Sequence, residues 1–228
     1  MKHVLIITGG HLNIEFAKAY CKTLSYDKVF AVDKGLEYCQ ELDLIPDYII
    51  GDFDTVRREV LQYYERKIQK QELSAILQRH PEKKDATDTE LAVTLAVEQE
   101  AEYITLLGAT GSRLDHVFAN IFLLKMAISK GVVMEIADET NRIQILEGNS
   151  RSHCSICKSQ QHGTYISLVP LTEQVEGVTI EGVEYPLTDA TIYQMSSYTI
   201  SNQITADKVD VSIKKGTILV VESRDALM

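Results

Sequence analysis

The chain of 228 residues is long enough to bury one large core or two smaller ones. Hydrophobic residues make up 45% and charged residues 25%, as in an ordinary globular protein, and no apolar run approaches the roughly 20 residues of a membrane helix. The formal net charge of -10, from 33 acidic and 23 basic residues, argues against a nucleic-acid partner because such a surface repels phosphates.

Short β-rich runs alternate with longer amphipathic segments over the first part of the chain. The first run, Val4 to Ile7, is shorter than the roughly 7–15 apolar residues of a signal peptide, so we expect a buried strand and a cytoplasmic protein. Strands are predicted at residues 3–8, 28–33, 47–50, 103–107 and 132–137, and helices at 13–24, 36–42, 88–99 and 114–129. This alternation predicts an α/β fold, with a mostly parallel sheet covered by helices on both faces. The polar, helical-looking segment 56–84 has no clear place in the sheet and is predicted to be peripheral.

After residue 145 the helical periodicity disappears, and short strands recur between turns. They are predicted at residues 165–169, 175–180, 190–193, 209–213 and 217–222, which indicates a small antiparallel β sandwich or barrel. The polar segment 148–163 is the expected linker. We therefore predict an α/β domain over 1–147, a linker loop over 148–163 and a β domain over 164–228.

The four cysteines include a C-x-x-C pair, Cys154 and Cys157, with His162 close by. Such a pair occurs in zinc and redox sites. A zinc site usually needs four spaced ligands, and the sequence holds no second C-x-x-C, so a solvated loop is the favoured interpretation. Cys21 and Cys39 lie in helical-looking stretches and are expected to be core residues.

The segment Gly51-Asp52-Phe53-Asp54 follows an apolar run directly. Residues i and i+2 of an extended chain point the same way, so Asp52 and Asp54 can present two carboxylates together. Ligands of open α/β sheets bind at the carboxyl ends of the strands, and paired carboxylates beside substrate phosphates suit Mg²⁺. A simple turn is the alternative, because Gly and Asp both favour turns.

A second acidic group, Asp85-Ala86-Thr87-Asp88-Thr89-Glu90, precedes the helix expected at 88–99. Thr87 and Glu90 fit a capping box, which places Asp88 in the first turn, where the helix dipole favours an acid. This structural explanation is sufficient by itself. A metal site becomes the better explanation if Asp88 faces Asp52 and Asp54 across the sheet edge.

A third group, Gly108-Ala109-Thr110-Gly111-Ser112-Arg113-Leu114-Asp115-His116, connects a predicted strand to a predicted helix, with Ser112 as the expected N-cap. Its backbone N–H groups and Arg113 could bind phosphate. It matches neither the P-loop nor the dinucleotide fingerprint. A tight connection with an internal Arg113–Asp115 contact is the alternative. Gly9-Gly10 and Asp33-Lys34-Gly35 supply two more loops at the same predicted edge.

These groups occur together and in order in a known family. Asp33-Lys34-Gly35, the run 45–55 with its Gly-Asp-Phe-Asp, the segment 85–92 and the segment 108–120 resemble thiamine pyrophosphokinase. The segments 167–171, 182–187 and 196–202 resemble the β domain of that family, so the resemblance spans nearly the whole chain.

The resemblance implies a transfer of the terminal diphosphate of ATP to the hydroxyl of thiamine, with AMP as the second product. It implies that Asp52, Asp54 and Asp88 hold Mg²⁺ on the ATP phosphates. It also implies that residues around ATP and the reacting diphosphate are Asp33, Asp85, Gly108, Thr110, Gly111, Arg113 and Asp115. Ser201 and Asn202 would help hold thiamine, and the protein would be a homodimer. Asp85 and Asp115 remain open as acceptors of the hydroxyl proton.

Three positions depart from the family pattern. Lys34 stands where a glycine is usual, and Ala86 where a lysine is usual, which affects the expected nucleotide contacts. Ser197-Tyr198-Thr199 replaces a Ser-Leu-Gly type of turn beside the expected thiamine pocket. Two alternative functions are a pyrophosphokinase for another hydroxymethyl heterocycle, such as a pterin, and a nucleotide-sensing protein without turnover.

Overall fold

The computed structural model describes residues 2–81 and 85–226, which form two compact units divided between residues 139 and 140. The predicted boundary at residue 147 is therefore wrong, because the segment 141–147 is a strand of the second unit. The predicted linker 148–163 is also wrong, since it contains the strand β8 (His153–Cys157) and a short 3-10 helix, Lys158–Gln160. Both elements are polar on their exposed side, and this polarity suggested a loop.

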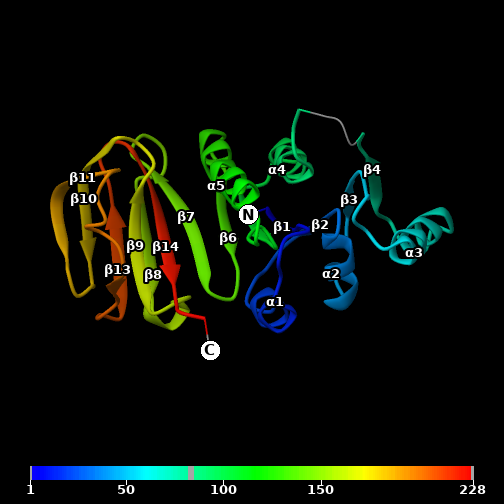
Figure 1. The fold of residues 1–228 in the computed structure, drawn as a ribbon, viewed down its shortest axis with the longest axis horizontal. Helices are drawn as coiled ribbons and strands as arrows, with labels where there is room; N and C mark the ends of the chain where they lie inside the picture. The colour runs from blue at the N-terminus through cyan, green and yellow to red at the C-terminus, as the bar shows by residue number, and fades with distance from the viewer. Residues whose placement is uncertain (1, 82–84, 227–228) are drawn as a thin grey trace. The chain divides into compact units, whose positions relative to one another are not determined.

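The first unit is built on a parallel sheet (Figure 1). Its strands pair in the order β6-β5-β1-β2-β3-β4, and every pairing is parallel. Their bounds are β1 (His3–Ile7), β2 (Lys28–Val32), β3 (Tyr48–Gly51), β4 (Ile76–Arg79), β5 (Tyr103–Leu107) and β6 (Val133–Ala137). All five residues of β1 are buried, as expected for a central strand covered on both faces.

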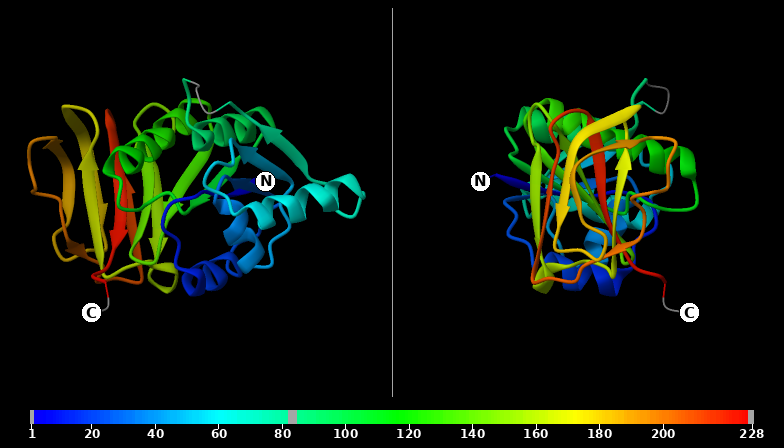
Figure 2. Two further views of the ribbon diagram at one scale, coloured as in Figure 1. Left: turned by 45° about the vertical axis from the view of Figure 1, so that its right-hand side comes forward. Right: turned by 90° about the vertical axis from the view of Figure 1, so that its left-hand side faces the viewer.

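The helices that cover this sheet are α1 (Ile14–Cys21), α2 (Gly35–Glu41), α3 (Arg58–Gln69), α4 (Asp88–Glu98) and α5 (Leu114–Ser129). The left view of Figure 2 shows α4 and α5 on one side of the sheet, and α1 and α2 on the other. Leu5 and Ile7 belong to the core that includes Ala17 of α1 and Leu36 of α2. The predicted sheet with helices on both faces is confirmed.

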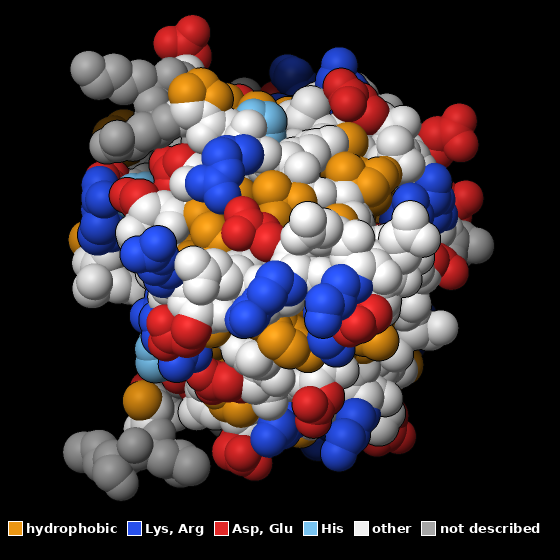
Figure 3. All heavy atoms as spheres, turned by 90° about the vertical axis from the view of Figure 1, so that its right-hand side faces the viewer, with side chains coloured by type: hydrophobic (Ala, Val, Ile, Leu, Met, Phe, Trp, Pro, Cys, Tyr) orange, Lys and Arg blue, Asp and Glu red, His pale blue; other side chains and the backbone are white. Residues whose placement is uncertain are grey.

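The segment 56–84 joins the fold more closely than the sequence predicts. Val60 and Tyr64 of α3 are buried in the core, and β4 pairs with β3 as the edge strand. Half of the Ile76 side chain is exposed, so this strand lacks the apolar run of a central strand. Figure 3 shows acidic and basic side chains interspersed on this face of the molecule. Residues 82–84 of the predicted peripheral segment lie outside the described part of the chain.

The second unit is an antiparallel β sandwich of two four-stranded layers, in the orders β12-β9-β14-β7 and β11-β10-β13-β8. Its remaining strands are β7 (Asn141–Glu147), β9 (Tyr165–Pro170), β10 (Gln174–Glu181), β11 (Leu187–Tyr193), β12 (Asn202–Gln203), β13 (Lys208–Ser212) and β14 (Thr217–Ser223). Ile166, Leu168 and Ile218 of the first layer pack with Val178 and Val209 of the second. The predicted small antiparallel domain is therefore confirmed as a sandwich.

Within the described residues, none of the helices has the length and apolar character needed to cross a lipid bilayer.

Candidate functional site

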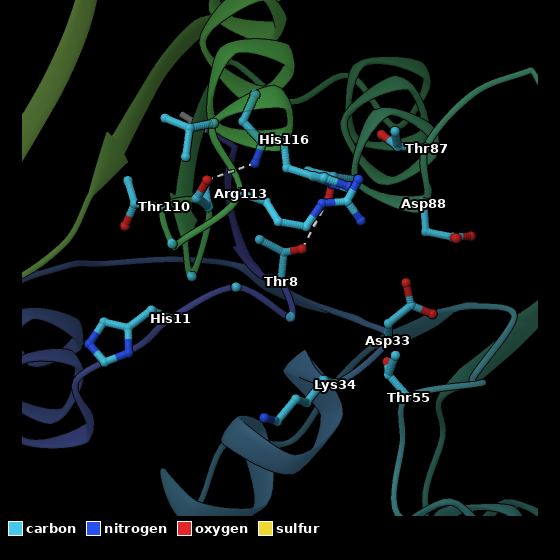
Figure 4. A pocket seen from close by; sticks show the side chains of 18 of the residues that line it. Thr8, His11, Asp33, Lys34, Thr55, Thr87, Asp88, Thr110, Arg113 and His116 are labelled. Carbon is cyan, nitrogen blue, oxygen red and sulfur yellow. Dashed lines mark hydrogen bonds between the residues drawn. The ribbon is translucent and has the colours of Figure 1, made fainter.

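The carboxyl ends of four parallel strands surround a pocket of about 1150 Å³ in the first unit. The loops after β1, β2, β3 and β5 line it, together with the beginnings of α4 and α5. Figure 4 shows side chains from these separate segments around the pocket, with Asp33 and Asp88 both directed toward it. Parallel pairing is what brings these loops to one edge of the sheet.

Most of the residues predicted for the site line this pocket: Asp33, Asp52, Asp54, Asp85, Asp88, Gly108, Thr110, Gly111 and Arg113. Asp115 is not among the lining residues. Sequence reasoning passed over Thr8, Thr55, Thr89 and Asn120, which also line it. Hydroxyl and amide side chains give no distinctive spacing signal, and only their place after the strands could have indicated them.

Asp33 lies where the loop after β2 meets the loop after β3. Its backbone is left-handed, with φ of 46°, and its N–H donates to the Ile50 carbonyl at 3.0 Å. Its Oδ1 accepts a hydrogen bond from the Phe53 N–H at 3.4 Å. A Cβ on Gly51 would lie 1.9 Å from that same oxygen, so only glycine allows the Asp33 carboxylate to lie against this backbone. The loop after β2 and the loop after β3 therefore pack directly against each other.

Asp52 and Asp54 both line the pocket, while the Phe53 ring between them is buried in the core. The chain is not extended here, because Phe53 has φ of 65° and the Asp54 N–H donates to Asp52 Oδ1 at 3.1 Å. For this segment the sequence predicts either a turn or a pair of carboxylates facing one site. Both are present, because the turn itself places Asp52 and Asp54 at the pocket. An aspartate that accepts a hydrogen bond from a residue two positions on is a common stabiliser of such turns.

Asp88 lies in the first turn of α4, with 8% of its surface exposed. Thr87 is the N-cap, and its hydroxyl accepts a hydrogen bond from the Glu90 N–H at 3.1 Å, as the capping pattern predicts. The Thr89 and Thr8 hydroxyls lie 2.9 Å apart and connect the start of α4 to the end of β1. The cap and this link direct Asp88 into the same pocket as Asp52 and Asp54.

The loop before α5 combines backbone contacts with an exposed ion pair. The Gly10 N–H donates to the Gly108 carbonyl, and the His11 N–H to the Thr110 carbonyl, both at 2.8 Å. Arg113 occupies the N-cap position without a side-chain cap, so the predicted N-cap at Ser112 is wrong.

The ion pair predicted as an alternative is present in this loop. Arg113 Nη2 lies 2.6 Å from Asp115 Oδ2, and these two side chains are 70% and 65% exposed. The hydrogen bond from the Arg113 guanidinium holds the pKa of the Asp115 carboxyl below its usual range. Because both side chains are largely exposed to water, Arg113 can leave this partner at little cost to bind an anion in the pocket.

The carboxylates around the pocket fit Mg²⁺ in one specific way. Within residues 2–81 and 85–226, no three His, Cys, Asp or Glu side chains form a group that could hold a metal ion by themselves. Mg²⁺ usually binds one or two protein carboxylates and completes its octahedral shell with water and substrate phosphates. Asp52, Asp54 and Asp88 supply hard oxygen donors of this kind around a space large enough for a nucleotide.

The second unit contains a smaller pocket of about 300 Å³, lined by Asn202 and mainly apolar or aromatic side chains. Asn202 accepts a hydrogen bond from the Tyr185 N–H at 3.0 Å and donates one to the Tyr185 carbonyl at 2.8 Å. Ser201 is left-handed, with φ of 59°, and its N–H donates to the Ser167 hydroxyl at 2.9 Å. Asn202 thus holds the exposed Tyr185 at the pocket, whereas Ser201 does not line it.

Cys154 and Cys157 lie on β8 and not on a loop, which corrects the sequence interpretation. Cys154 is buried and Cys157 is exposed, because residues three apart on a strand point to opposite faces. The pair therefore cannot bind one ion or form a disulfide. His162 is buried, and its backbone N–H donates to Glu222 Oε2 at 3.0 Å.

Comparisons with known proteins give one family for both units. The thiamin pyrophosphokinase catalytic domain matches residues 22–136, and the thiamin pyrophosphokinase vitamin B1 binding domain matches residues 152–218. A thiamine pyrophosphokinase of Bacillus subtilis is 29% identical over 226 residues, covering 99% of this chain and 100% of that protein.

Two solved structures of the same family are similar to this chain in three dimensions. The crystal structure of thiamine pyrophosphokinase from Bacillus subtilis superposes with a TM-score of 0.86 at 27% identity, covering 99% of this chain and 100% of that one. The thiamin pyrophosphokinase from Geobacillus thermodenitrificans gives a TM-score of 0.79 at 29% identity, with 98% of each chain covered. With both of its domains matched in order, this chain belongs to the thiamine pyrophosphokinase family.

Proposed function

We propose that this chain is an ATP-dependent thiamine pyrophosphokinase that moves a diphosphate from ATP to the thiamine hydroxyl and releases AMP. The observation that carries this proposal is one pocket lined by Asp33, Asp52, Asp54 and Asp88, which come from two loops and a helix start of a family-matched catalytic domain. The nearly complete coverage of a named relative supports the whole reaction and not a fragment of it.

In this proposal Asp52, Asp54 and Asp88 hold Mg²⁺. When bound, Mg²⁺ offsets the phosphate charge that an acidic pocket would otherwise repel. Residues proposed to bind the nucleotide are Asp33, Gly108, Thr110, Gly111, Arg113 and Asp115. Arg113 is suited to the diphosphate because its planar guanidinium can donate two parallel hydrogen bonds.

The chain would act mainly by binding and orienting the reactants, as in other phosphoryl transfers. The pocket holds the nucleotide so that the thiamine hydroxyl approaches the β-phosphorus in line with the departing AMP. Asp85 is the favoured acceptor of the hydroxyl proton, because it lines the pocket. Asp115 lies outside the lining.

We further propose that Ser201 and Asn202 help to hold thiamine, beside the small pocket of the second unit. The aromatic Tyr185 and Tyr198 in its lining are suited to a flat cationic heterocycle. The chain is also proposed to be a cytoplasmic homodimer, as the family resemblance implies. Light scattering coupled to size exclusion should give twice the chain mass of 25.6 kDa.

The direct test incubates the protein with ATP, Mg²⁺ and thiamine, and measures thiamine diphosphate by mass and AMP by chromatography. Both products are expected in equal amounts, and chelation of Mg²⁺ should abolish them. A panel of hydroxymethyl pterins should give no product. Formation of a pterin diphosphate instead, or tight Mg·ATP binding with no AMP, would overturn the proposal in favour of the pterin kinase or the nucleotide sensor.

A further inference from the structure

Glu37 is a buried carboxylate outside the pocket lining, and the proposed reaction gives it no role. It lies in the first turn of α2, with 6% of its surface exposed. Both of its oxygens contact Arg57: Oε1 accepts from the backbone N–H at 2.6 Å, and Oε2 accepts from Nε at 2.8 Å. A carboxylate this deeply buried needs strong partners, and a single residue supplies both.

Arg57 ends the loop 52–57, which connects β3 to α3 and carries Asp52 and Asp54. It stands at the N-cap position of α3, and its own side chain caps nothing. The first N–H groups of a helix lack partners within that helix, and a carboxylate is favoured beside them. Glu37 therefore supplies the cap for α3 from a different helix.

The loop contains a conformation that needs such support. Phe53, between the two aspartates, is left-handed with φ of 65°, which a bulky residue rarely adopts. Conformations of this kind persist only where the surrounding structure holds them. Asp33 holds the Phe53 N–H, and the Arg79 guanidinium lies 5.0 Å from the centre of the Phe53 ring. Glu37 holds the other end of the loop.

The helix that carries Glu37 is itself firmly placed. Leu36 and Cys39 on either side of it are completely buried. A Cβ on Gly35 would lie 2.0 Å from the Ile7 carbonyl oxygen, so the first turn of α2 lies directly against the end of β1. Glu37 thus connects the loop of Asp52 and Asp54 to the rigid centre of the sheet.

We propose that Glu37 is a positioning residue for the proposed Mg·ATP site, acting through Arg57 to hold the Asp52–Asp54 loop in its binding geometry. This inference rests on the proposed function. Groups that orient metal ligands without touching the metal typically account for about 10–100-fold in metal affinity or activity. Glu37→Gln should weaken Mg·ATP binding by that factor and leave half-saturation by thiamine unchanged, because the second unit is untouched.

The chain contains a closely matched control. Glu222 in the second unit is also almost fully buried, accepts from Arg142 Nε at 2.7 Å, and accepts from the His162 N–H at 3.0 Å. Glu222→Gln removes the same kind of charge from the same kind of arrangement, in the unit that does not carry the Asp52–Asp54 loop. Arg57→Ala is a milder second variant, because it retains the backbone N–H that donates a hydrogen bond to Glu37 Oε1.

Two measurements test the proposal. Calorimetric titration with Mg·ATP should give at least tenfold weaker binding for Glu37→Gln, an intermediate loss for Arg57→Ala and no change for Glu222→Gln. Hydrogen exchange without ligand should be faster at residues 53–57 in Glu37→Gln, less so in Arg57→Ala, and unchanged there in Glu222→Gln. The positioning role is refuted if the wild type binds Mg·ATP and Glu37→Gln binds it equally well, or if Glu222→Gln weakens binding as much.

The hydrogen-exchange arm separates this inference from the proposed function. A wild type that binds no Mg·ATP and forms no AMP overturns the function, and with it the metal-site role of Glu37. Faster exchange at residues 53–57 would then still identify Glu37 as the support of the loop. If Glu37→Gln fails to fold, Arg57→Ala decides, and unchanged Mg·ATP affinity and loop exchange in that variant refute the inference.

Discussion

Replacing Glu135 with glutamine should destabilise the first unit, because this buried carboxylate is the acceptor of three hydroxyl groups. Glu135 lies on β6 and is 3% exposed. Its Oε1 accepts from the Tyr20 hydroxyl at 2.8 Å and from Thr105 at 3.1 Å, and its Oε2 accepts from Tyr103 at 2.8 Å. These contacts connect α1, β5 and β6 on one face of the sheet.

The magnitude follows from these contacts. A hydrogen bond to a charged group contributes about 1.5–3 kcal/mol. Glutamine keeps one carbonyl oxygen for Tyr20 and Thr105 but presents an NH₂ group to Tyr103, whose hydroxyl must turn to accept. Removal of the buried charge offsets part of the loss, so we expect a net cost of about 2 kcal/mol for Glu135→Gln. Tyr20→Phe should cost about 1.5 kcal/mol, since its hydroxyl is partly accessible to water.

Hydrogen exchange of the β5 and β6 amides is the suitable assay, because it reports the opening of the first unit separately from the second. The double variant Glu135→Gln/Tyr20→Phe should lose about 1 kcal/mol less than the sum of the single variants, since the hydrogen bond from Tyr20 is stronger to the carboxylate than to the neutral amide. Strictly additive losses, or a Glu135→Gln variant within about 0.5 kcal/mol of the wild type, would refute the reasoning.

Three further outcomes are expected. Asp54→Asn should lower turnover by about 100-fold or more while Asp189→Asn, on an exposed pair with Lys214, leaves it unchanged; normal turnover in Asp54→Asn would contradict the metal assignment. Folded protein at pH 8 should react rapidly with a thiol reagent at Cys157 and slowly at Cys154, because burial raises the pKa of the Cys154 thiol to about 11; equal rates would contradict the strand geometry of β8. Gly35→Ala should lower stability by about 1–3 kcal/mol, because the added Cβ would lie 2.0 Å from the Ile7 carbonyl oxygen; thermal unfolding measures this, and an unchanged midpoint would contradict the close approach of α2 to β1.

The amino-acid sequence by itself determined the layered fold and the edge of the sheet where the pocket lies. Apolar runs of strand length alternating with amphipathic helices require a parallel sheet, and parallel strands necessarily bring their following loops to one edge. That is why Asp33, Asp52 and Asp54, which lie in separate loops, could be predicted to lie at one edge. For Asp88 the residues alone were explained by the start of a helix, and only the family resemblance placed it with the other aspartates. The capping pattern of Thr87 is equally local, and it was predicted correctly.

Tertiary structure alone decided which polar segments join the fold and which partners support the site. The polar β4 becomes a strand only because β3 offers it an edge, and β8 only because β13 does. No local pattern could place Glu37 against Arg57, since that contact requires α2 and the loop 52–57 to meet. Hydrophobic periodicity indicates whether a segment is a helix or a strand and which of its side chains are buried. Pairing between distant segments depends instead on the geometry of the assembled sheet.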